Sequence, residues 1–166
     1  NNNLIAFSVK GVGLPEGPVF PNRFPAGAVD NYLAEKKMSR TNISTGAWRA
    51  PRSHFTAGAE QAFIDEVAEA AEKDPIDFRL ELFEKAINNP VGEKYEYDAE
   101  RYAGVLKLVK EKSNWGTGTL AVHRGVAAYY CHNSYVAEVM DVVIENNQPK
   151  VKKVWCAVDC GIVINK

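Results

Sequence analysis

Two pairs of neighbouring residues carry side chains that could act as nucleophile and base, Ser53-His54 and Cys131-His132. Hydrolases of this kind need both side chains within hydrogen-bond reach of each other. Cys131 and His132 lie in a strand-like run, where successive side chains point to opposite faces, so we expect them not to pair. Nothing around either pair resembles the nucleophile elbow of an α/β-hydrolase. The pattern therefore disfavours hydrolase chemistry.

The chain has three cysteines, Cys131, Cys156 and Cys160. An odd number does not suggest a disulfide framework. Cys156 and Cys160 fall on one face of a strand-like run, roughly 13 Å apart along an extended strand, which is too far for a disulfide. His123, Cys131 and His132 do not have the spacing of a zinc site. We expect buried structural cysteines and no metal site.

Arg49 is the stronger candidate for binding. It follows Trp48 in the irregular segment Thr45–Pro51, shortly before a helical pattern. A loop of this kind can offer backbone amides and a guanidinium group to an anion such as a phosphate or a pterin. The alternative is an arginine that stacks on Trp48 or caps a nearby carbonyl group, and the residue pattern alone favours that alternative.

The composition excludes several classes of protein. The 166 residues are 46% hydrophobic and 25% charged, which is typical of one globular domain. The 20 Lys and Arg against 21 Asp and Glu give a net charge of −1 without a basic tract. Nucleic-acid binding needs a concentrated positive surface, so we do not expect a nucleic-acid partner. No apolar run approaches the roughly 20 residues of a transmembrane helix.

Three segments have the periodicity of amphipathic helices. The first covers the residues around Phe63, and the second begins with Asp74 as N-cap and Pro75 at the first helical position. The third runs from about Asp98 to Lys112. The expected inward-facing residues are Phe63, Ile64, Val67, Ala68 and Ala71 in the first, Ile76, Leu80, Phe83 and Ile87 in the second, and Tyr102, Val105, Leu106 and Val109 in the third.

The C-terminal part has the period of two that is typical of strands. We expect strands at about Thr119–Tyr130, Tyr135–Glu145 and Val151–Val158, with Asn146–Pro149 as a hairpin connection. Tyr135–Glu145 has apolar residues on both faces, which predicts an inner strand covered on both sides. Together these elements predict an α+β fold, a mostly antiparallel sheet with about three helices packed on it.

Five segments follow one another in a specific order: Gly46–Pro51, Ala59–Ala68, Asp74–Arg79, Ser134–Val139 and Cys156–Asn165. Together they resemble the molybdenum-cofactor-binding subunit of the xanthine dehydrogenase/aldehyde oxidase family. The branch that they resemble is the isoquinoline 1-oxidoreductase beta-subunit type, in which a Gly-x-Trp-Arg segment precedes a Phe-Ile-Asp-Glu helix and an Asp-Pro helix.

This resemblance implies an oxidoreductase that hydroxylates N-heteroaromatic or aldehyde substrates with oxygen derived from water. The implied cofactor is molybdopterin, in bacteria often as the cytosine dinucleotide. The implied partners are the rest of the molybdenum subunit, a small [2Fe–2S] subunit and a small-molecule substrate. Arg49 matches a family position that touches the cofactor through its backbone amide, and Trp48 and Ala50 frame it, so these three are the expected cofactor-binding residues. Asp159, Gly161 and Asn165 match an Asp-x-Gly…Asn turn, which we interpret as architectural.

The resemblance further implies that residues 1–166 are one α+β segment in the interior of a larger molybdopterin-binding subunit. The glutamate that acts as catalytic base is expected beyond Lys166, so no residue here is assigned a catalytic role. The isolated chain is expected to be inactive and to bind neither cofactor nor metal. The alternative is a free-standing α+β binding or interaction module that keeps the scaffold without the chemistry. The substrate, the oligomeric state and the compartment (bacterial cytoplasm or periplasmic side of the inner membrane) stay open.

Overall fold

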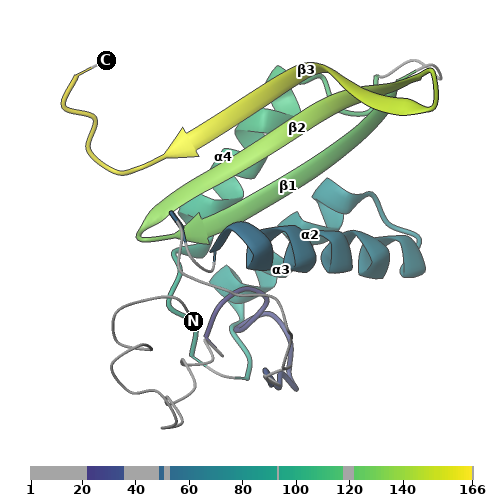
Figure 1. The fold of residues 1–166 in the computed structure, drawn as a ribbon. Coiled ribbons are helices and arrows are strands. Elements are labelled where there is room, and N and C mark those ends of the chain that lie inside the picture. Colours follow the sequence, from purple (N-terminus) through teal and green to yellow (C-terminus); the bar gives the residue numbers. More distant parts are fainter. Residues whose placement is uncertain (1–21, 36–48, 51–52, 93, 118–121, 166) are drawn as a thin grey trace, which may run out of the picture.

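The computed structural model describes residues 22–35, 49–50, 53–92, 94–117 and 122–165. Within these residues, three helices come first, α2 (Ser53–Ala70), α3 (Pro75–Asn88) and α4 (Ala99–Lys112). Three strands follow, β1 (His123–Cys131), β2 (Ser134–Glu145) and β3 (Gln148–Asp159) (Figure 1). These elements confirm the predicted α+β fold. The predicted first strand was expected to begin at Thr119, but residues 118–121 lie outside the described residues and β1 begins at His123.

The three strands form an antiparallel sheet in the order β1-β2-β3. Two-residue turns connect them, His132-Asn133 and Asn146-Asn147, and all four residues have positive φ between 50° and 58°. Positive φ at both central residues is the geometry that suits the twist of a tight hairpin, and asparagine adopts it readily. The predicted connection Asn146–Pro149 is therefore too long, because Pro149 already lies in the edge strand β3, opposite Ile144.

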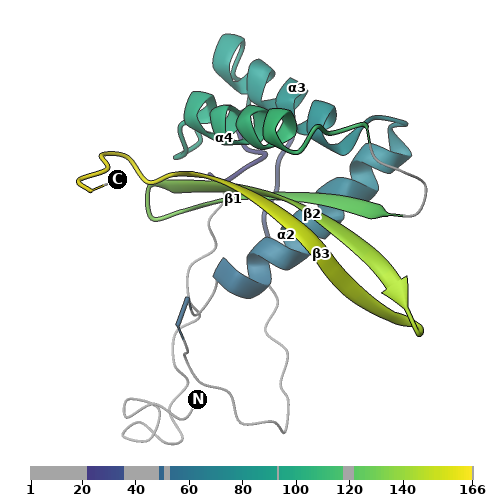
Figure 2. The ribbon, with the colours of Figure 1, turned by 90° about the horizontal axis from the view of Figure 1, so that it is seen from above.

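One face of the sheet packs against helices. Figure 2 shows α3 and α4 on one side of the sheet, with α4 nearer to it. Ala137 and Val139 on β2 and Ala157 on β3 are buried on this side. On the opposite face, Val154 is 45% and Val158 is 57% exposed. The prediction that β2 is covered on both sides is therefore wrong, because α3 and α4 cover one face and Glu138 of β2 is exposed on the other.

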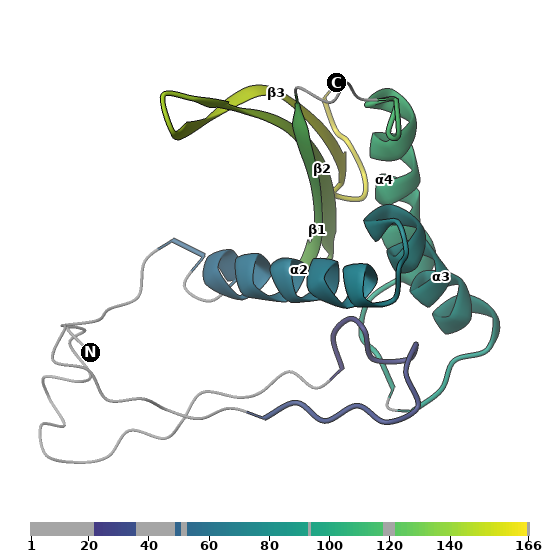
Figure 3. The ribbon, with the colours of Figure 1, turned by 90° about the vertical axis from the view of Figure 1, so that its right-hand side faces the viewer.

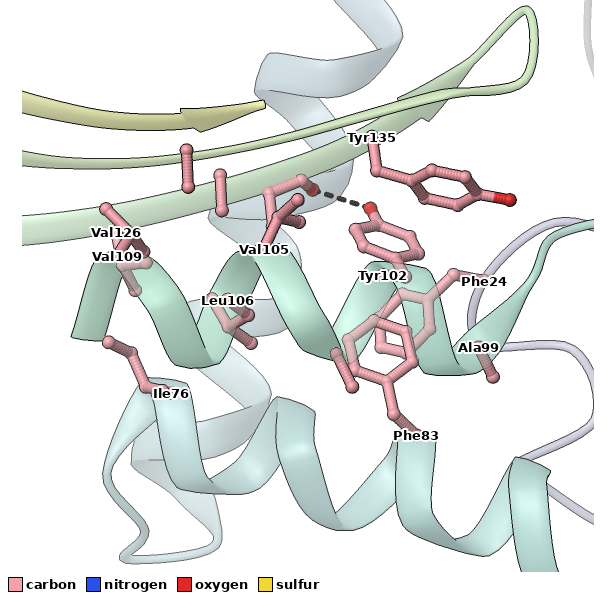
Figure 4. Packing of buried hydrophobic residues seen from close by; sticks show 14 of the residues in the cluster. Phe24, Ile76, Phe83, Ala99, Tyr102, Val105, Leu106, Val109, Val126 and Tyr135 are labelled. Carbon is pink, nitrogen blue, oxygen red and sulfur yellow. Dashed lines mark hydrogen bonds between the residues drawn. The ribbon is translucent and has the colours of Figure 1, made fainter. Parts of the chain in front are cut away.

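Aromatic residues form the centre of the core between α3, α4 and the sheet (Figure 4). The ring of Tyr102 on α4 lies 4.6 Å from that of Phe83 on α3 and 5.9 Å from that of Phe24, measured between ring centroids. The Tyr102 hydroxyl donates a hydrogen bond of 2.7 Å to the carbonyl of Ala128 on β1. Tyr102 therefore joins α4 to the sheet through both its ring and its hydroxyl.

The N-terminal caps of α3 and α4 agree with the sequence. The Asp74 carboxylate accepts hydrogen bonds from the amides of Ile76 and Asp77, at 2.9 and 3.0 Å. The Asp98 carboxylate accepts one from the amide of Arg101, at 3.0 Å. These contacts satisfy amides that the helix itself leaves without partners.

Helix α2 lies across the β1 end of the sheet (Figure 3). Its buried residues are Gln61, Ile64 and Ala68, whereas Phe63 is 62% exposed. The prediction that Phe63 belongs to the core is wrong. The face of α2 that carries Gln61 contacts β1, because Gln61 Oε1 accepts a hydrogen bond of 3.0 Å from the amide of Ala128. Gln61 is therefore on the buried face of α2, where the apolar pattern predicted Phe63. Ile87 on α3, also expected inside, is 37% exposed.

Arg79 on α3 is buried, with a side chain that is 1% exposed. Its guanidinium donates to the Gln61 side chain at 3.1 Å, to the carboxylate of Asp65 at 2.7 Å and to the carbonyl of Pro75 at 2.9 Å. A buried charge is tolerated when it is paired and fully hydrogen-bonded. Arg79 and Gln61 together connect α3, α2 and the outer edge of β1.

Candidate functional site

Two of the predicted cofactor-binding residues, Arg49 and Ala50, precede α2 in the chain and are exposed. Trp48 lies outside the described residues. Ala50 has φ of 55°, a left-handed conformation that costs an alanine about 1–2 kcal/mol. His54 Nδ1 donates a hydrogen bond to the carbonyl of Ala50, which holds this backbone against the first turn of the helix. Backbone held in a costly conformation is often found at binding sites.

The groups at this helix start suit an anion. The first turn of α2 carries no acidic side chain, so the positive end of the helix dipole is not neutralised there. Arg49 adds an exposed guanidinium, and backbone amides near a helix start are donors that phosphate groups use. With Nδ1 of His54 donating to Ala50, Nε2 of the neutral imidazole is an acceptor, so His54 positions the backbone and adds no donor for an anion. The exposed guanidinium and the first turn without acidic side chains can therefore bind an anion.

One turn further along α2, a second polar group faces the sheet. Thr56 Oγ1 lies 3.3 Å from the Tyr129 hydroxyl, which accepts a hydrogen bond of 3.4 Å from Arg23. Glu60 lies beside them on a small cavity, and burial raises the pKa of its carboxyl to about 7. Residues lining this cavity are Arg23, Phe24, Glu60, Tyr102, Tyr129 and Tyr130. A carboxyl that titrates near neutral pH can hold or release a proton under physiological conditions.

Neither Arg23 nor Glu60 was singled out from the sequence. One signal was present: Glu60 precedes Ile64 by four residues and Ala68 by eight, so it stands on the same helical stripe as two buried residues. An acidic residue on a buried stripe is worth inspection as a candidate for an altered pKa. Arg23 had no such signal because it lies in a segment without periodicity.

A separate surface pocket of about 530 Å³ lies at the N-terminal end of α4. Arg101 crosses it and binds the Asp159 carboxylate with two hydrogen bonds, at 2.9 and 2.7 Å. This guanidinium lowers the pKa of Asp159 to about 2. Asp159 also accepts a hydrogen bond of 2.9 Å from the amide of Gly161. Asp159 and Gly161 thus form the turn that we interpreted as architectural, and Arg101 fixes that turn to α4.

The cysteines differ from the sequence-based expectation. Cys156 and Cys160 are exposed and Cys131 is half-buried, so the prediction of buried structural cysteines is wrong. Cys131 Sγ lies 2.8 Å from Nδ1 of His132, although the two were expected to point apart. The physical reason is that β1 ends at Cys131 and His132 belongs to the left-handed turn, so strand alternation does not apply to the pair.

Two observations concern metal and membrane. Within the described residues, no three His, Cys, Asp or Glu side chains lie close enough together to hold a metal ion. Of the described helices, none combines the length and the apolar character that crossing a bilayer requires.

Comparison with curated proteins gives two relatives. The chain is 32% identical over 111 residues to isoquinoline 1-oxidoreductase subunit beta of Brevundimonas diminuta, covering 63% of this chain and 12% of that protein. This bears out the resemblance read from the sequence motifs. The chain is also 35% identical over 98 residues to a membrane-bound aldehyde dehydrogenase [pyrroloquinoline-quinone] of Gluconacetobacter polyoxogenes, covering 58% of this chain and 12% of that protein. Both relatives are oxidoreductases by name.

The extent of the similarity limits what it shows. The chain spans about an eighth of the length of the curated relatives that it matches. No protein-family profile matches the chain, and no solved structure matches it significantly. The relatives therefore indicate an oxidoreductase type and, for the first, one subunit of a larger enzyme.

Proposed function

We propose that this chain is a cofactor-adjacent segment of a molybdenum hydroxylase subunit that acts on N-heteroaromatic or aldehyde substrates. The observation that carries the proposal is the similarity to isoquinoline 1-oxidoreductase subunit beta, together with the family-like Trp48-Arg49-Ala50 segment. The groups at the start of α2 support it, because exposed Arg49 and a first turn without an acidic side chain suit an anionic cofactor.

Within this proposal the chain holds the cofactor. Molybdopterin supplies the redox chemistry when bound, and the protein supplies position and electrostatics. The amide of Arg49 would donate a hydrogen bond to the cofactor, next to the left-handed Ala50. His54 keeps Ala50 in place. The base, the iron–sulfur partner and the substrate pocket belong to other parts of the enzyme, so the isolated chain is expected to be inactive.

Two substitutions of Arg49 in the full-length subunit test this role. Arg49→Ala keeps the backbone amide and is expected to spare most cofactor binding. Arg49→Pro removes the amide and fixes φ, and is expected to abolish cofactor retention. If the guanidinium made the main contact instead, Arg49→Ala alone would lose a charge-assisted hydrogen bond of about 1.5–3 kcal/mol.

The measurement is molybdenum and pterin content per purified subunit, with Glu69→Ala as a matched control on the exposed side of α2. Unchanged metal content in both Arg49 variants would show that Arg49 is a loop residue without a cofactor contact. The name of the second relative favours one further candidate, a pyrroloquinoline-quinone-dependent dehydrogenase. Quinone without molybdenum in the wild-type protein would support that candidate.

The remaining alternative is a free-standing α+β binding module. The reading frame that encodes the chain separates it from the main proposal. A frame that continues beyond Lys166 into a Gly-Glu segment, beside a gene for a small [2Fe–2S] protein, supports the hydroxylase subunit. A stop codon after Lys166 supports the module.

A further inference from the structure

The turn between β1 and β2 brings a thiol and a base together. Cys131 Sγ lies 2.8 Å from His132 Nδ1, within hydrogen-bond reach for a thiol that donates to an imidazole. The pair exists because His132 and Asn133 adopt positive φ of 50° and 58°. Cys131 is half-buried and His132 is exposed, so a small solute can reach the sulfur from the turn.

The turn is fixed in place from outside. Arg101 donates hydrogen bonds to the side-chain oxygen and to the carbonyl of Asn133, at 3.3 and 3.4 Å. The same guanidinium is bound to Asp159 at 2.7 Å. The hydrogen bonds of Arg101 therefore hold the turn against both α4 and the end of β3. This limits the freedom of His132, which immediately precedes Asn133.

A positive charge lies next to the thiol. The guanidinium of Arg23 donates to the carbonyl of Tyr130, the residue immediately before Cys131, at 3.5 Å. Opposite charges attract most strongly at short range, so this guanidinium attracts the negative charge that develops on the sulfur during reaction.

Cys156 provides an internal contrast in the same sheet. Its neighbour is the carboxylate of Glu138, and burial together with that carboxylate raises the pKa of the Cys156 thiol. A negative neighbour disfavours the thiolate, which is the nucleophilic form. The chain therefore holds one thiol beside a base and a cation, and another beside an anion.

We propose that Cys131 is a thiol-modification site that reacts with low-molecular-weight disulfides. His132 accepts the proton of the Cys131 thiol, and the resulting thiolate attacks one sulfur of the disulfide. A new S–S bond forms at Cys131 as the old S–S bond breaks, and the leaving thiolate takes the proton from the His132 imidazolium. One thiol is oxidised and half of the disulfide is reduced, so no other reactant is needed.

The probe is glutathione disulfide, added to the 166-residue chain at neutral pH. The rate of mixed-disulfide formation at each cysteine is followed by mass spectrometry of the digested protein. Cys131 is expected to react about tenfold faster than Cys156, and also faster than the exposed Cys160. His132→Asn is expected to slow Cys131 by about tenfold, because asparagine keeps the left-handed turn but cannot take the proton.

Circular dichroism confirms that the variants fold, and His123→Asn at the other end of β1 is the matched control, with an unchanged rate expected. The proposal is overturned if Cys156 or Cys160 reacts as fast as Cys131. An unaltered Cys131 rate in folded His132→Asn protein would equally overturn it. The outcome does not depend on cofactor binding at Arg49.

Discussion

Replacing Glu60 by glutamine should stabilise the protein above neutral pH. Glu60 lies on α2 beside a small cavity, with Tyr102 and Tyr129 among its neighbours. Burial raises the pKa of its carboxyl from 4.5 to about 7, while Arg23 and Arg79 act in the opposite direction. Glutamine has nearly the same shape and carries no charge, so the variant removes the ionisation and little else.

The sign follows from the protons bound in each state. The unfolded chain loses the Glu60 proton near pH 4.5, whereas the folded protein keeps it up to about pH 7. Between these values the folded state binds more protons, so its stability falls as the pH rises, and it stays at the lower value above that window. Above neutral pH, ionisation of Glu60 therefore lowers the free energy of unfolding of the wild-type protein, and Glu60→Gln lacks this effect.

The magnitude comes from the same two values. A pKa that moves from 4.5 to about 7 corresponds to at most about 3.5 kcal/mol, at about 1.4 kcal/mol per pH unit. Glu60 is half-buried, and solvent screens part of this cost, so a gain of roughly 1–2 kcal/mol is expected. At about pH 4 the carboxyl is mostly protonated in both states, and no gain is expected there.

Urea denaturation at about pH 4 and about pH 8, followed by tryptophan fluorescence, measures both free energies of unfolding. Glu69→Gln changes an exposed residue on the same helix. Its free energy of unfolding should equal that of the wild-type protein at both pH values. A loss of stability at the higher pH in Glu60→Gln would refute the reasoning. It would mean that Glu60 is ionised in the folded protein and stabilised by Arg23 and Arg79.

Three further substitutions test stability. Arg79→Ala should lower the free energy of unfolding by about 3–5 kcal/mol in urea melts, because it removes a buried side chain and its hydrogen bonds to Gln61, Asp65 and Pro75; a loss below about 1 kcal/mol would contradict this. Phe83→Ala should cost about 3–5 kcal/mol in the same assay, because Phe83 is 1% exposed. Phe63→Ala should cost under about 1 kcal/mol, because Phe63 is 62% exposed, and equal losses at the two positions would show that the assignment of the core is wrong.

Local signals in the sequence predicted much of the fold. Asp74 and Asp98 were assigned as helix starts, and both side chains accept hydrogen bonds from amides of the first turn. Such caps depend on residues within one turn, so the sequence contains all the information that they need. The burial of Phe83 followed likewise from helical periodicity.

Features that depend on contacts between distant residues were not predictable in this way. Gln61 is buried and Phe63 is exposed, because the Gln61 side chain accepts a hydrogen bond from the edge of β1, 67 residues away. Cys131 and His132 pair because a strand ends between them, and the ends of elements are the least certain part of a sequence-based assignment. At the candidate site, the exposure of Arg49 agrees with a binding role, whereas the altered pKa of Glu60 arises from packing against β1 and Arg23.

The glutamine contact between α2 and β1 also protects one edge of the sheet from pairing with another strand. An unpaired edge strand is a template for another strand, and folded proteins protect such edges in different ways. At β1, Gln61 occupies the outward amide of Ala128, so an incoming strand would first have to displace a helix. At β3 the protection is electrostatic, through Lys150, Lys152 and Lys153, which would repel the same residues of a second copy. Pairing with another strand is therefore opposed by the packed helix α2 at the β1 edge and by charge repulsion at the β3 edge. Added salt screens charges, so it weakens the protection of the β3 edge only.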